Sequence, residues 1–318
     1  MSHKNFAIGI DLGGTNIKAG AVDKSGKILF KTSIPTEAEL GYKHVIKQIV
    51  KASKIVIEKA GQPDGVGIGA PGVVDFKTGE VKSPPNIPGW GNVNLKKILE
   101  KELRIRAVVE NDANAAAIGE YIYGAGKQNG TFIMVTLGTG VGGGIFFNGK
   151  LFRGETGGAG EIGHITINFN GRRCNCGSYG CIEAYVGNSR IAADTKKKIK
   201  LVKNTALLDL LDGDLSKLSP KVIFEAAKAG DEFSRDVIAQ IAEMLGAALA
   251  SAANLLDIST IIVGGGVSGF GKFLFEPLRH SAKKRVLAPL RPRLKIIRSK
   301  LGNAAGLKGA AALVYYKE

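Results

Sequence analysis

Phe6-Ala-Ile-Gly-Ile10 and Asp11-Leu-Gly-Gly-Thr15 open the chain with an apolar run and a glycine-rich turn. Residues 17–22 run back as a second apolar segment, and the turn Asp23-Lys-Ser-Gly26 leads into a third, residues 27–34. Short apolar runs separated by such turns predict consecutive β-strands. The chain is therefore predicted to begin with three strands, the first two joined by a glycine turn.

The same plan returns in the middle of the chain. Thr131-Phe-Ile-Met-Val135 is apolar, Thr136-Leu-Gly-Thr-Gly140 forms the turn, and Gly144-Ile-Phe-Phe147 runs back. Each hairpin is also followed by a helix-like segment and then by a strand that ends in a glycine turn, residues 45–59 with 66–72 and residues 235–256 with 260–266. Two related halves predict a duplicated α/β protein with a cleft between the halves.

Length and cysteine use indicate two soluble domains inside the cell. A chain of 318 residues is long enough for two domains. No uninterrupted apolar run is long enough to span a membrane, and the N-terminus lacks a signal-peptide pattern. The cysteines lie in one stretch without a disulfide framework, which suits a reducing compartment. We therefore expect a cytoplasmic protein with no membrane partner.

The net charge of +16 is high and admits two kinds of partner. Nucleic acid is one, and anionic substrates such as nucleotides are the other. The positive charge is not gathered into a recognisable nucleic-acid motif. The densest run, residues 196–200, is predicted to be a solvated helix face. We therefore expect no nucleic-acid partner.

Three cysteines and a histidine form the most specific motif of the chain. Cys174, Cys176 and Cys181 follow closely after His164. Disulfides fit poorly because the count is odd and a Cys-x-Cys pair closes a strained ring. Ordinary buried cysteines would scatter through the core instead. Three thiols and one imidazole suit tetrahedral zinc, with His164 as the nearest histidine by far for the fourth ligand.

The glycine turns have two possible interpretations. Gly138-x-Gly140-x-x-Gly143 matches the dinucleotide fingerprint in spacing, but that fingerprint requires a helix where this chain continues as a strand. No GxxxxGK[ST] loop is present either. The turns could be tight hairpins only. Because two occur in equivalent places and a third, Gly264-Gly265-Gly266, precedes a helix, we expect their backbone N–H groups to hold phosphates.

Asp112 is the best catalytic candidate. Residues 106–110 predict a buried strand, and a helix is predicted from there to about Tyr123. In isolation Asp112 would be an ordinary helix N-cap. The end of a strand that faces a cleft is also where α/β proteins bind ligands. Phosphoryl transfer to a hydroxyl needs one carboxylate to orient the hydroxyl and accept its proton, so Asp112 could serve in both ways.

These motifs together resemble the ROK family of sugar kinases, within the actin-like ATPase superfamily. The resemblance runs from Phe6 to Gly302-Asn-Ala-Ala-Gly306, and its segments are Asp11–Thr15, Asn111–Asn114, Leu137–Gly144, Glu161–His164 and Cys174–Glu183. It implies an α/β, duplicated actin-like (ribonuclease H-like) fold of two domains with a cleft between them. The small N-terminal domain would comprise residues 1–112, completed by a C-terminal helix at about 302–318. The large domain would comprise residues 113–301 and carry the zinc motif.

The resemblance also implies an activity. The family's members transfer a phosphoryl group from ATP to a hexose 6-hydroxyl with magnesium, and glucose is the first expectation. Kinases for N-acetylmannosamine, N-acetylglucosamine or fructose are the alternatives, and polyphosphate stays open as the donor. A sugar-responsive repressor is less favoured, because such regulators carry a helix-turn-helix before the kinase-like body and the first strand begins near Asn5. Homodimers or homotetramers are implied as well.

The resemblance assigns roles residue by residue. Asp112 matches the catalytic base. The sugar hydroxyls would be bound by Asn86, Asn111, Glu161, His164 and Glu183. The nucleotide and its phosphates would be bound by Asp11, Gly13, Gly14, Thr15, Lys18, Gly138, Thr139, Gly140, Gly264, Gly265 and Gly266, with Asp11 near the magnesium. A structural zinc would be held by His164, Cys174, Cys176 and Cys181. If one ring nitrogen of His164 binds zinc, the other is fixed in direction and could bond a sugar hydroxyl.

Overall fold

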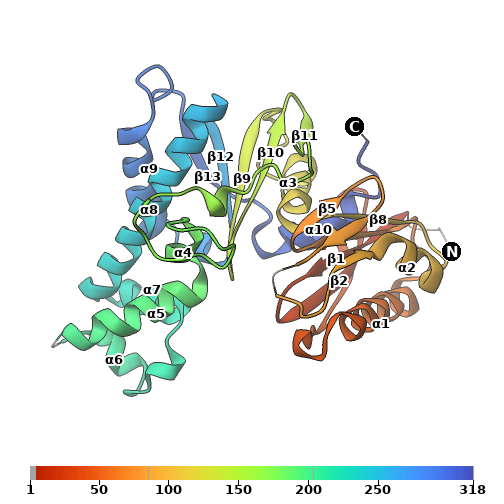
Figure 1. The fold of residues 1–318 in the computed structure, drawn as a ribbon, viewed down its shortest axis with the longest axis horizontal. Helices are drawn as coiled ribbons and strands as arrows, with labels where there is room; N and C mark the ends of the chain where they lie inside the picture. Colours follow the sequence, from red (N-terminus) through yellow and green to blue (C-terminus); the bar gives the residue numbers. More distant parts are fainter. Residues whose placement is uncertain (1–4, 85, 203, 318) are drawn as a thin grey trace. The chain divides into compact units, whose positions relative to one another are not determined.

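The computed structural model describes residues 5–84, 86–202 and 204–317 (Figure 1). The chain divides into two compact units. Unit 1 comprises Met1–Met134, Gly143–Gly160 and Ser299–Glu318, and unit 2 comprises Val135–Gly142 and Glu161–Arg298. Unit 1 thus contains more than the small domain expected from the sequence. The domain boundary at residue 112 stays a prediction.

The first sheet lies in unit 1 and has the strand order β3-β2-β1-β4-β8. Its strands are β1 (Phe6–Leu12), β2 (Asn16–Asp23), β3 (Ile28–Pro35), β4 (Val66–Ala70) and β8 (Ala107–Asn111). The first three are antiparallel neighbours, while β4 runs parallel to β1 and β8 parallel to β4. The predicted opening of three strands is therefore confirmed.

The second sheet repeats this order. Its strands are β9 (Phe132–Leu137), β10 (Val141–Phe147), β11 (Lys150–Phe152), β12 (Thr260–Gly265) and β13 (Lys295–Arg298). They are arranged as β11-β10-β9-β12-β13, so each strand has a counterpart at the same place in the first sheet. The internal repeat predicted from the glycine turns is confirmed. A small third sheet contains β5 (Val73–Asp75), β6 (Glu80–Lys82) and β7 (Asn92–Asn94).

Helices cover both faces of the first sheet. Branched apolar side chains of β1, such as Ile8 and Ile10, belong to one core with α1 (Tyr42–Ala60) and α2 (Leu95–Leu103). The helices α3 (Asp112–Tyr123) and α10 (Ala305–Ala312) pack together and against β1 and β4. The alternating side chains of β1 thus separate a large-residue face from a small-residue face.

Glycine makes the small-residue face possible. A Cβ atom on Gly9 would collide with the backbone of Leu307, and one on Gly67 would collide with the carbonyl of Ala310. Helix α10 therefore lies directly on the sheet. The same approach brings Gly306 against the end of β1, where a Cβ would lie 2.9 Å from the carboxyl carbon of Asp11.

Unit 2 carries the remaining helices. They are α4 (Glu183–Val186), α5 (Asn188–Lys198), α6 (Ala206–Leu210), α7 (Pro220–Ala229), α8 (Glu232–Leu256) and α9 (Lys272–Arg285). The short 3₁₀ turns among the described residues are η1 (Ala38–Leu40), η2 (Ile162–His164), η3 (Ile199–Leu201), η4 (Leu215–Lys217), η5 (Gly266–Phe270) and η6 (Gly302–Ala304). The lysines of residues 196–200 are exposed at the end of α5, as predicted.

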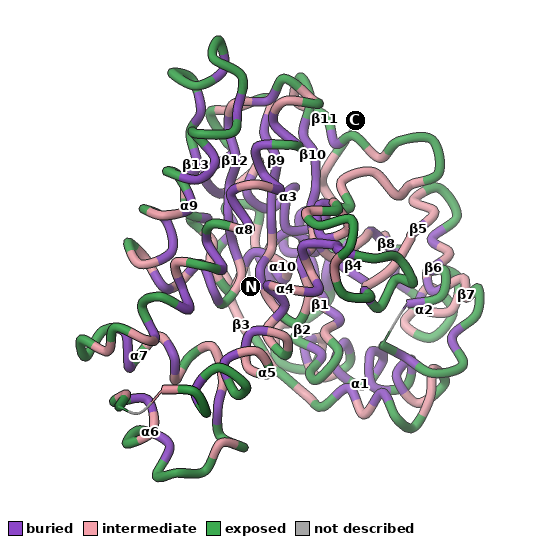
Figure 2. Tube along the Cα trace, turned by 60° about the vertical axis from the view of Figure 1, so that its left-hand side comes forward, coloured by how far each residue is buried: buried purple, intermediate pink, exposed green. Residues whose placement is uncertain are grey.

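Helix α8 is the central helix of unit 2. It is long and apolar enough to cross a membrane, but 61% of its most apolar stretch is buried. It packs along α9 and touches α7, and buried segments alternate with exposed ones along it (Figure 2). This is the pattern of a core helix in a soluble protein.

Candidate active site

Unit 1 brings Asp11 and Asp112 to the same edge of its sheet. Strand register pairs Asp11 with Gly69 on β4, and Gly69 with Glu110 on β8. Asp112 follows β8 directly, and a Cβ on Gly69 would lie 3.2 Å from its Cα. Both aspartates therefore stand at the carboxyl ends of parallel strands, which is where ligands bind in α/β proteins.

Asn111, and not Asp112, caps helix α3. The Asn111 Oδ1 accepts hydrogen bonds from the N–H groups of Ala113 at 2.9 Å and Asn114 at 3.1 Å. Its Nδ2 donates to the Gly72 carbonyl at 3.0 Å. The N-cap role weighed for Asp112 in the sequence is thus filled by the residue before it. Asp112 is the first residue of the helix, and its carboxylate accepts the N–H of Ala113 at 2.8 Å.

The turn between β1 and β2 presents free backbone donors. Gly13 N–H donates to the Asn16 carbonyl at 3.1 Å, and the buried Thr36 hydroxyl donates to the Gly13 carbonyl at 2.7 Å. These bonds close the turn from behind. Over residues 5–84, 86–202 and 204–317, the N–H groups of Gly14 and Thr15 have no acceptor. Such a concave pair of donors is suited to an anion.

Lys18 and Asn86 border the same turn. The Lys18 Nζ lies 3.3 Å from the Asp11 Oδ2. A Cβ on Gly14 would lie 4.0 Å from the side chain of Asn86. The predicted first-hairpin residues and one predicted sugar ligand are therefore neighbours in unit 1.

The turn between β9 and β10 holds the carboxylate of Glu183. The Val141 N–H donates to the Glu183 Oε2 at 2.9 Å. A Cβ on Gly140 would collide with that carboxylate, so only glycine permits the contact. As in the first hairpin, one bond closes the turn, from the Gly138 N–H to the Gly140 carbonyl at 3.0 Å.

The third glycine turn adjoins the second. Gly265 has a φ of 82° and lies against the backbone of Leu137, where no Cβ would fit. The segment after Glu183 also reaches this place, because the Asn188 N–H donates to the Gly138 carbonyl at 3.0 Å. Unit 2 therefore brings together the second and third turns that the sequence predicted for the nucleotide.

Glu161 and His164 lie near Glu183. Glu161 precedes the 3₁₀ turn η2 and His164 is its last residue, and the His164 Nε2 is 3.8 Å from the Glu161 Oε2. Burial raises the pKa of the Glu161 carboxyl, the His164 ring opposes this rise, and the Glu183 carboxylate adds to it. Gly163 packs against Val141, so the turn sits directly on the start of β10. Two carboxylates and one imidazole thus converge within unit 2.

Four side chains offer a complete zinc site. One donor atom each from His164, Cys174, Cys176 and Cys181 lies within 4.8 Å of all the others. The Cys176 and Cys181 sulfurs are 3.8 Å apart, and the Cys174 Sγ is 3.8 Å from the His164 Nδ1. Ligands about 2.3 Å from a tetrahedral zinc would lie about 3.8 Å apart. The donor set therefore fits the metal, and it uses Nδ1 of His164, which leaves Nε2 for the side of Glu161.

Cysteine sulfurs bind a metal ion as thiolates, so each thiol must first lose its proton. Burial raises the pKa of Cys181 to about 12, and burial also raises that of Cys174. A cation that binds these sulfurs must displace their protons, so its affinity falls as the pH falls.

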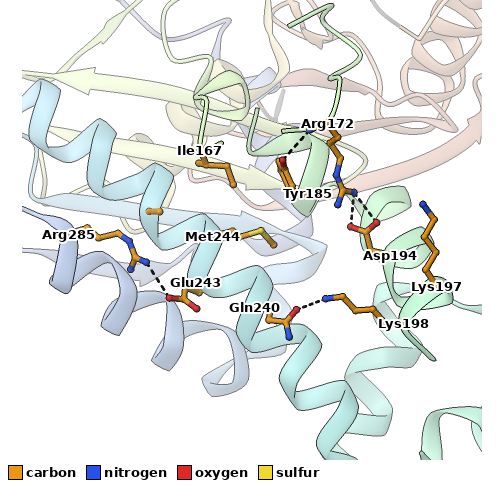
Figure 3. Close-up of a pocket in the computed structure, with 11 residues that line it drawn as sticks. Ile167, Arg172, Tyr185, Asp194, Lys197, Lys198, Gln240, Glu243, Met244 and Arg285 are labelled. Atoms are coloured by element: carbon orange, nitrogen blue, oxygen red, sulfur yellow. Dashed lines mark hydrogen bonds and ion pairs between the residues drawn. The ribbon is translucent and has the colours of Figure 1, made fainter. Parts of the chain in front are cut away.

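A separate cavity of about 700 Å³ lies in unit 2 beside the zinc loop (Figure 3). Its lining contains four cations, but three already have polar partners. Arg172 forms two bonds with Asp194 at 2.7 and 2.9 Å, Arg285 pairs with Glu243, and Lys198 donates to Gln240. The predicted sugar and phosphate ligands are not among the described residues that line it.

Sequence reasoning missed three parts of this arrangement. Gly306 gives Asp11 its place, Arg172 stacks on Tyr185 behind the zinc cysteines, and Glu110 pairs with Arg153 beneath the Asn111–Asp112 turn. Gly306 belongs to the C-terminal glycine motif, and the spacing of that motif was its only signal in the sequence. Arg172 and Tyr185 lie 13 residues apart and Glu110 and Arg153 lie 43 apart, and no sequence pattern links either pair.

Comparison with known proteins identifies relatives over the whole length. The ROK family profile matches residues 7–317. The glucokinase of Thermotoga maritima is 36% identical over 307 residues, 96% of each chain. A solved ROK family glucokinase from Streptomyces griseus, in complex with glucose and AMPPNP, has a TM-score of 0.90 at 40% identity and covers 97% of this chain and 99% of its own. The xylose repressor of Caldicellulosiruptor bescii is 32% identical over 96% of this chain and 77% of the repressor. The likeness to ROK structures confirms the predicted actin-like fold.

Zinc removal is expected to destabilise the protein. The purified chain should contain one zinc, and a chelator should lower its Tm by at least about 5 °C, because the metal replaces a missing core in the cysteine loop. Stripping should be faster at acidic pH, where protons compete for the sulfurs. Elemental analysis and thermal melts measure both effects. Cys176→Ser should lose the metal, whereas the loop control Ser178→Ala should keep it; full metal content in Cys176→Ser would contradict this site.

Proposed function

The chain belongs to the ROK family, and we propose that it is a glucokinase that transfers the γ-phosphoryl group of ATP to the 6-hydroxyl of glucose. One observation carries the proposal. Asn111 caps α3 with its own side chain, and Asp112, the first residue of that helix, follows β8 at the edge of the sheet where α/β proteins bind ligands. The glucose and AMPPNP in the Streptomyces griseus enzyme support these substrates.

Asp112 acts as the general base in this proposal. Its carboxylate orients the 6-hydroxyl and accepts the proton as the oxygen attacks the γ-phosphorus. Little covalent chemistry is left for the protein, because phosphoryl transfer depends chiefly on positioning and on stabilising charge. A single well-placed carboxylate contributes about 10²- to 10⁴-fold to such a step.

The other sugar hydroxyls are bound by five polar side chains in this proposal. They are those of Asn86, Asn111, Glu161, His164 and Glu183. Carboxylates accept short, strong hydrogen bonds from hydroxyls. Glu183 uses one oxygen on Val141, which leaves the other for the sugar, and Asn111 keeps one amide proton after its bond to Gly72.

The nucleotide is held mainly by backbone. Phosphate oxygens accept hydrogen bonds from the backbone N–H groups of Gly14 and Thr15 and of the turn Gly138–Gly140. Gly264–Gly266 lies on the adenosine side. Asp11, with the Lys18 Nζ 3.3 Å away, would hold the magnesium, which would neutralise charge on the phosphates.

His164, Cys174, Cys176 and Cys181 would hold a structural zinc away from the substrate. With Nδ1 of His164 on the metal, the ring would be fixed in direction, and its Nε2 could donate to or accept from a sugar hydroxyl. Unpaired cysteines with this role suit the reducing cytoplasm, where we place the enzyme. A homodimer or homotetramer stays a prediction.

Asp112→Asn is expected to abolish turnover while sparing sugar binding. The amide keeps the shape but cannot accept the proton, so kcat should fall by at least about 10²-fold and the glucose Kd should change less than about threefold. Coupled ADP release and calorimetric titration measure the two quantities. Asp75→Asn, in a turn of the same unit, is the matched control. Near-normal kcat in Asp112→Asn would remove this residue from the mechanism.

Gly140→Ala is expected to weaken sugar binding through Glu183. The added methyl group would displace the carboxylate from the Val141 N–H, so KM for glucose should rise by about tenfold. Gly138→Ala is the control, since a Cβ there meets nothing within 4 Å. Steady-state kinetics over a range of glucose concentrations will separate the two variants, and an equal effect on glucose KM would refute the argument.

A panel of hexoses and donors tests substrate choice directly. Glucose with ATP and magnesium should give the highest kcat/KM, above N-acetylmannosamine, N-acetylglucosamine and fructose, and polyphosphate should be the poorer donor. Product formation is measured as sugar phosphate, so that both donors are read on one scale. Preference for an N-acetylated sugar would keep the chemistry and change the assigned substrate.

A further inference from the structure

A buried ion pair lies directly beneath the Asn111–Asp112 turn. The side chains of Glu110 and Arg153 are 1% and 13% exposed, and the Arg153 Nε lies 2.7 Å from the Glu110 Oε2. The two residues stand 43 positions apart, at the end of β8 and just after β11. A charge pair with so little water around it is electrostatically strong and geometrically fixed.

The second oxygen of Glu110 holds the turn itself. Its Oε1 accepts the backbone N–H of Asn111 at 2.8 Å and the side-chain amide of Asn114 at 3.1 Å. These donors lie on either side of Asp112, one before it and one in the first turn of α3. The Glu110 carboxylate therefore fixes both the peptide that precedes Asp112 and the helical turn that follows it.

Arg153 is held just as firmly on its own side. Its guanidinium lies 3.9 Å from the centre of the Phe76 ring, and its carbonyl accepts the Ala159 N–H at 3.1 Å. Stacking on an aromatic face orients the planar guanidinium and leaves its edge for the carboxylate. Arg153 thus presents Glu110 with a cation of set direction.

Stability alone is a weak reason for such a pair. Desolvation offsets most of the attraction between two buried charges, and apolar replacements of a buried pair are often neutral or stabilising. Glu120 shows the contrast, because it is the other buried acid among the described residues and its bonds go to Ala125 and the segment Ser299–Leu301, away from Asp112.

We propose that Glu110 and Arg153 are positioning residues that set the orientation of the Asp112 carboxylate toward the sugar hydroxyl. The inference rests on the proposed role of Asp112 as the base. The pair does not touch the substrate. It fixes the backbone from which the base projects, and a displacement of about 1 Å at a reacting group can cost about 100-fold in rate.

Glu110→Gln and Arg153→Lys test this directly. Each keeps the approximate size but loses the charge pair or the guanidinium fork. We expect kcat to fall about 10- to 100-fold, with KM for glucose and ATP changed less than about threefold. Activity is normalised to the fraction of protein that binds glucose in a calorimetric titration, so that unfolded protein does not count as a loss of rate.

Two further variants separate positioning from folding. Glu120→Gln removes the other buried carboxylate, which lies on α3, and is expected to lower Tm without changing kcat per binding site. The double variant Glu110→Gln with Arg153→Met removes both charges, so its Tm should recover relative to Arg153→Met alone while its kcat stays low. A kcat that recovers together with Tm would show a structural pair only and would overturn the proposal.

The failure of this proposal can be told from a failure of the proposed function. Near-normal kcat in Glu110→Gln, with Asp112→Asn inactive, overturns the positioning role and leaves the base intact. Near-normal kcat in Asp112→Asn overturns the base itself, and with it the reason for positioning, whatever the Glu110 variants do.

Discussion

The proposed site depends on acidic residues that pack directly against glycines. The Glu183 carboxylate lies against Gly140 and the Asp11 carboxylate against Gly306, and a Cβ on either glycine would come within 3.0 Å of a carboxyl atom. At Gly69 the neighbour is the backbone of Asp112, whose Cα would lie 3.2 Å from such a Cβ. The same close approach of backbone, at Gly9 and Gly67, seats α10 on β1 and β4.

The two halves share one sheet topology, but their hairpin turns carry different side chains. The sheets share one strand order, and a single backbone bond closes each hairpin turn, from Gly13 in the first and from Gly138 in the second. The first turn begins with Asp11, whereas Thr136 stands at the matching place in the second. There the acid comes instead from Glu183, which is bound to Val141 from outside the hairpin. The acid of the first half, Asp11, thus lies on a strand of its own hairpin. The acid of the second half, Glu183, comes from the segment that follows the cysteine loop.

The sequence could predict what is local and periodic. The strand-turn-strand repeats, the cysteine cluster and the exposed lysines of α5 all follow from spacing, and the structure confirms them. The sequence could not tell which of two adjacent residues caps α3. Asn111 and Asp112 are both good helix caps, and only the structure shows that Asn111 is the N-cap. The ion pair between Glu110 and Arg153 could not be predicted, because a charged residue at the end of an apolar strand carries no sequence signal for a partner 43 positions away. Net charge did not help to locate the predicted site. Residues 277–317 contain eleven Lys or Arg and no Asp or Glu, yet they hold none of the predicted ligands.

The zinc loop shows why a metal is suited to support a sugar site. Between Thr166 and Tyr179 only Cys174 is buried, and Phe169 is 83% exposed, so the loop has almost no core of its own. A few backbone bonds, such as Cys174 N–H to the Ser178 carbonyl at 2.8 Å, could not hold it alone. Zinc ligation would supply that missing core and would end on His164, whose Nε2 lies 3.8 Å from the Glu161 carboxylate. In the proposed kinase the bonds that fold the loop would also orient this imidazole, so one ion would set both the stability of the loop and the direction of a proposed sugar ligand.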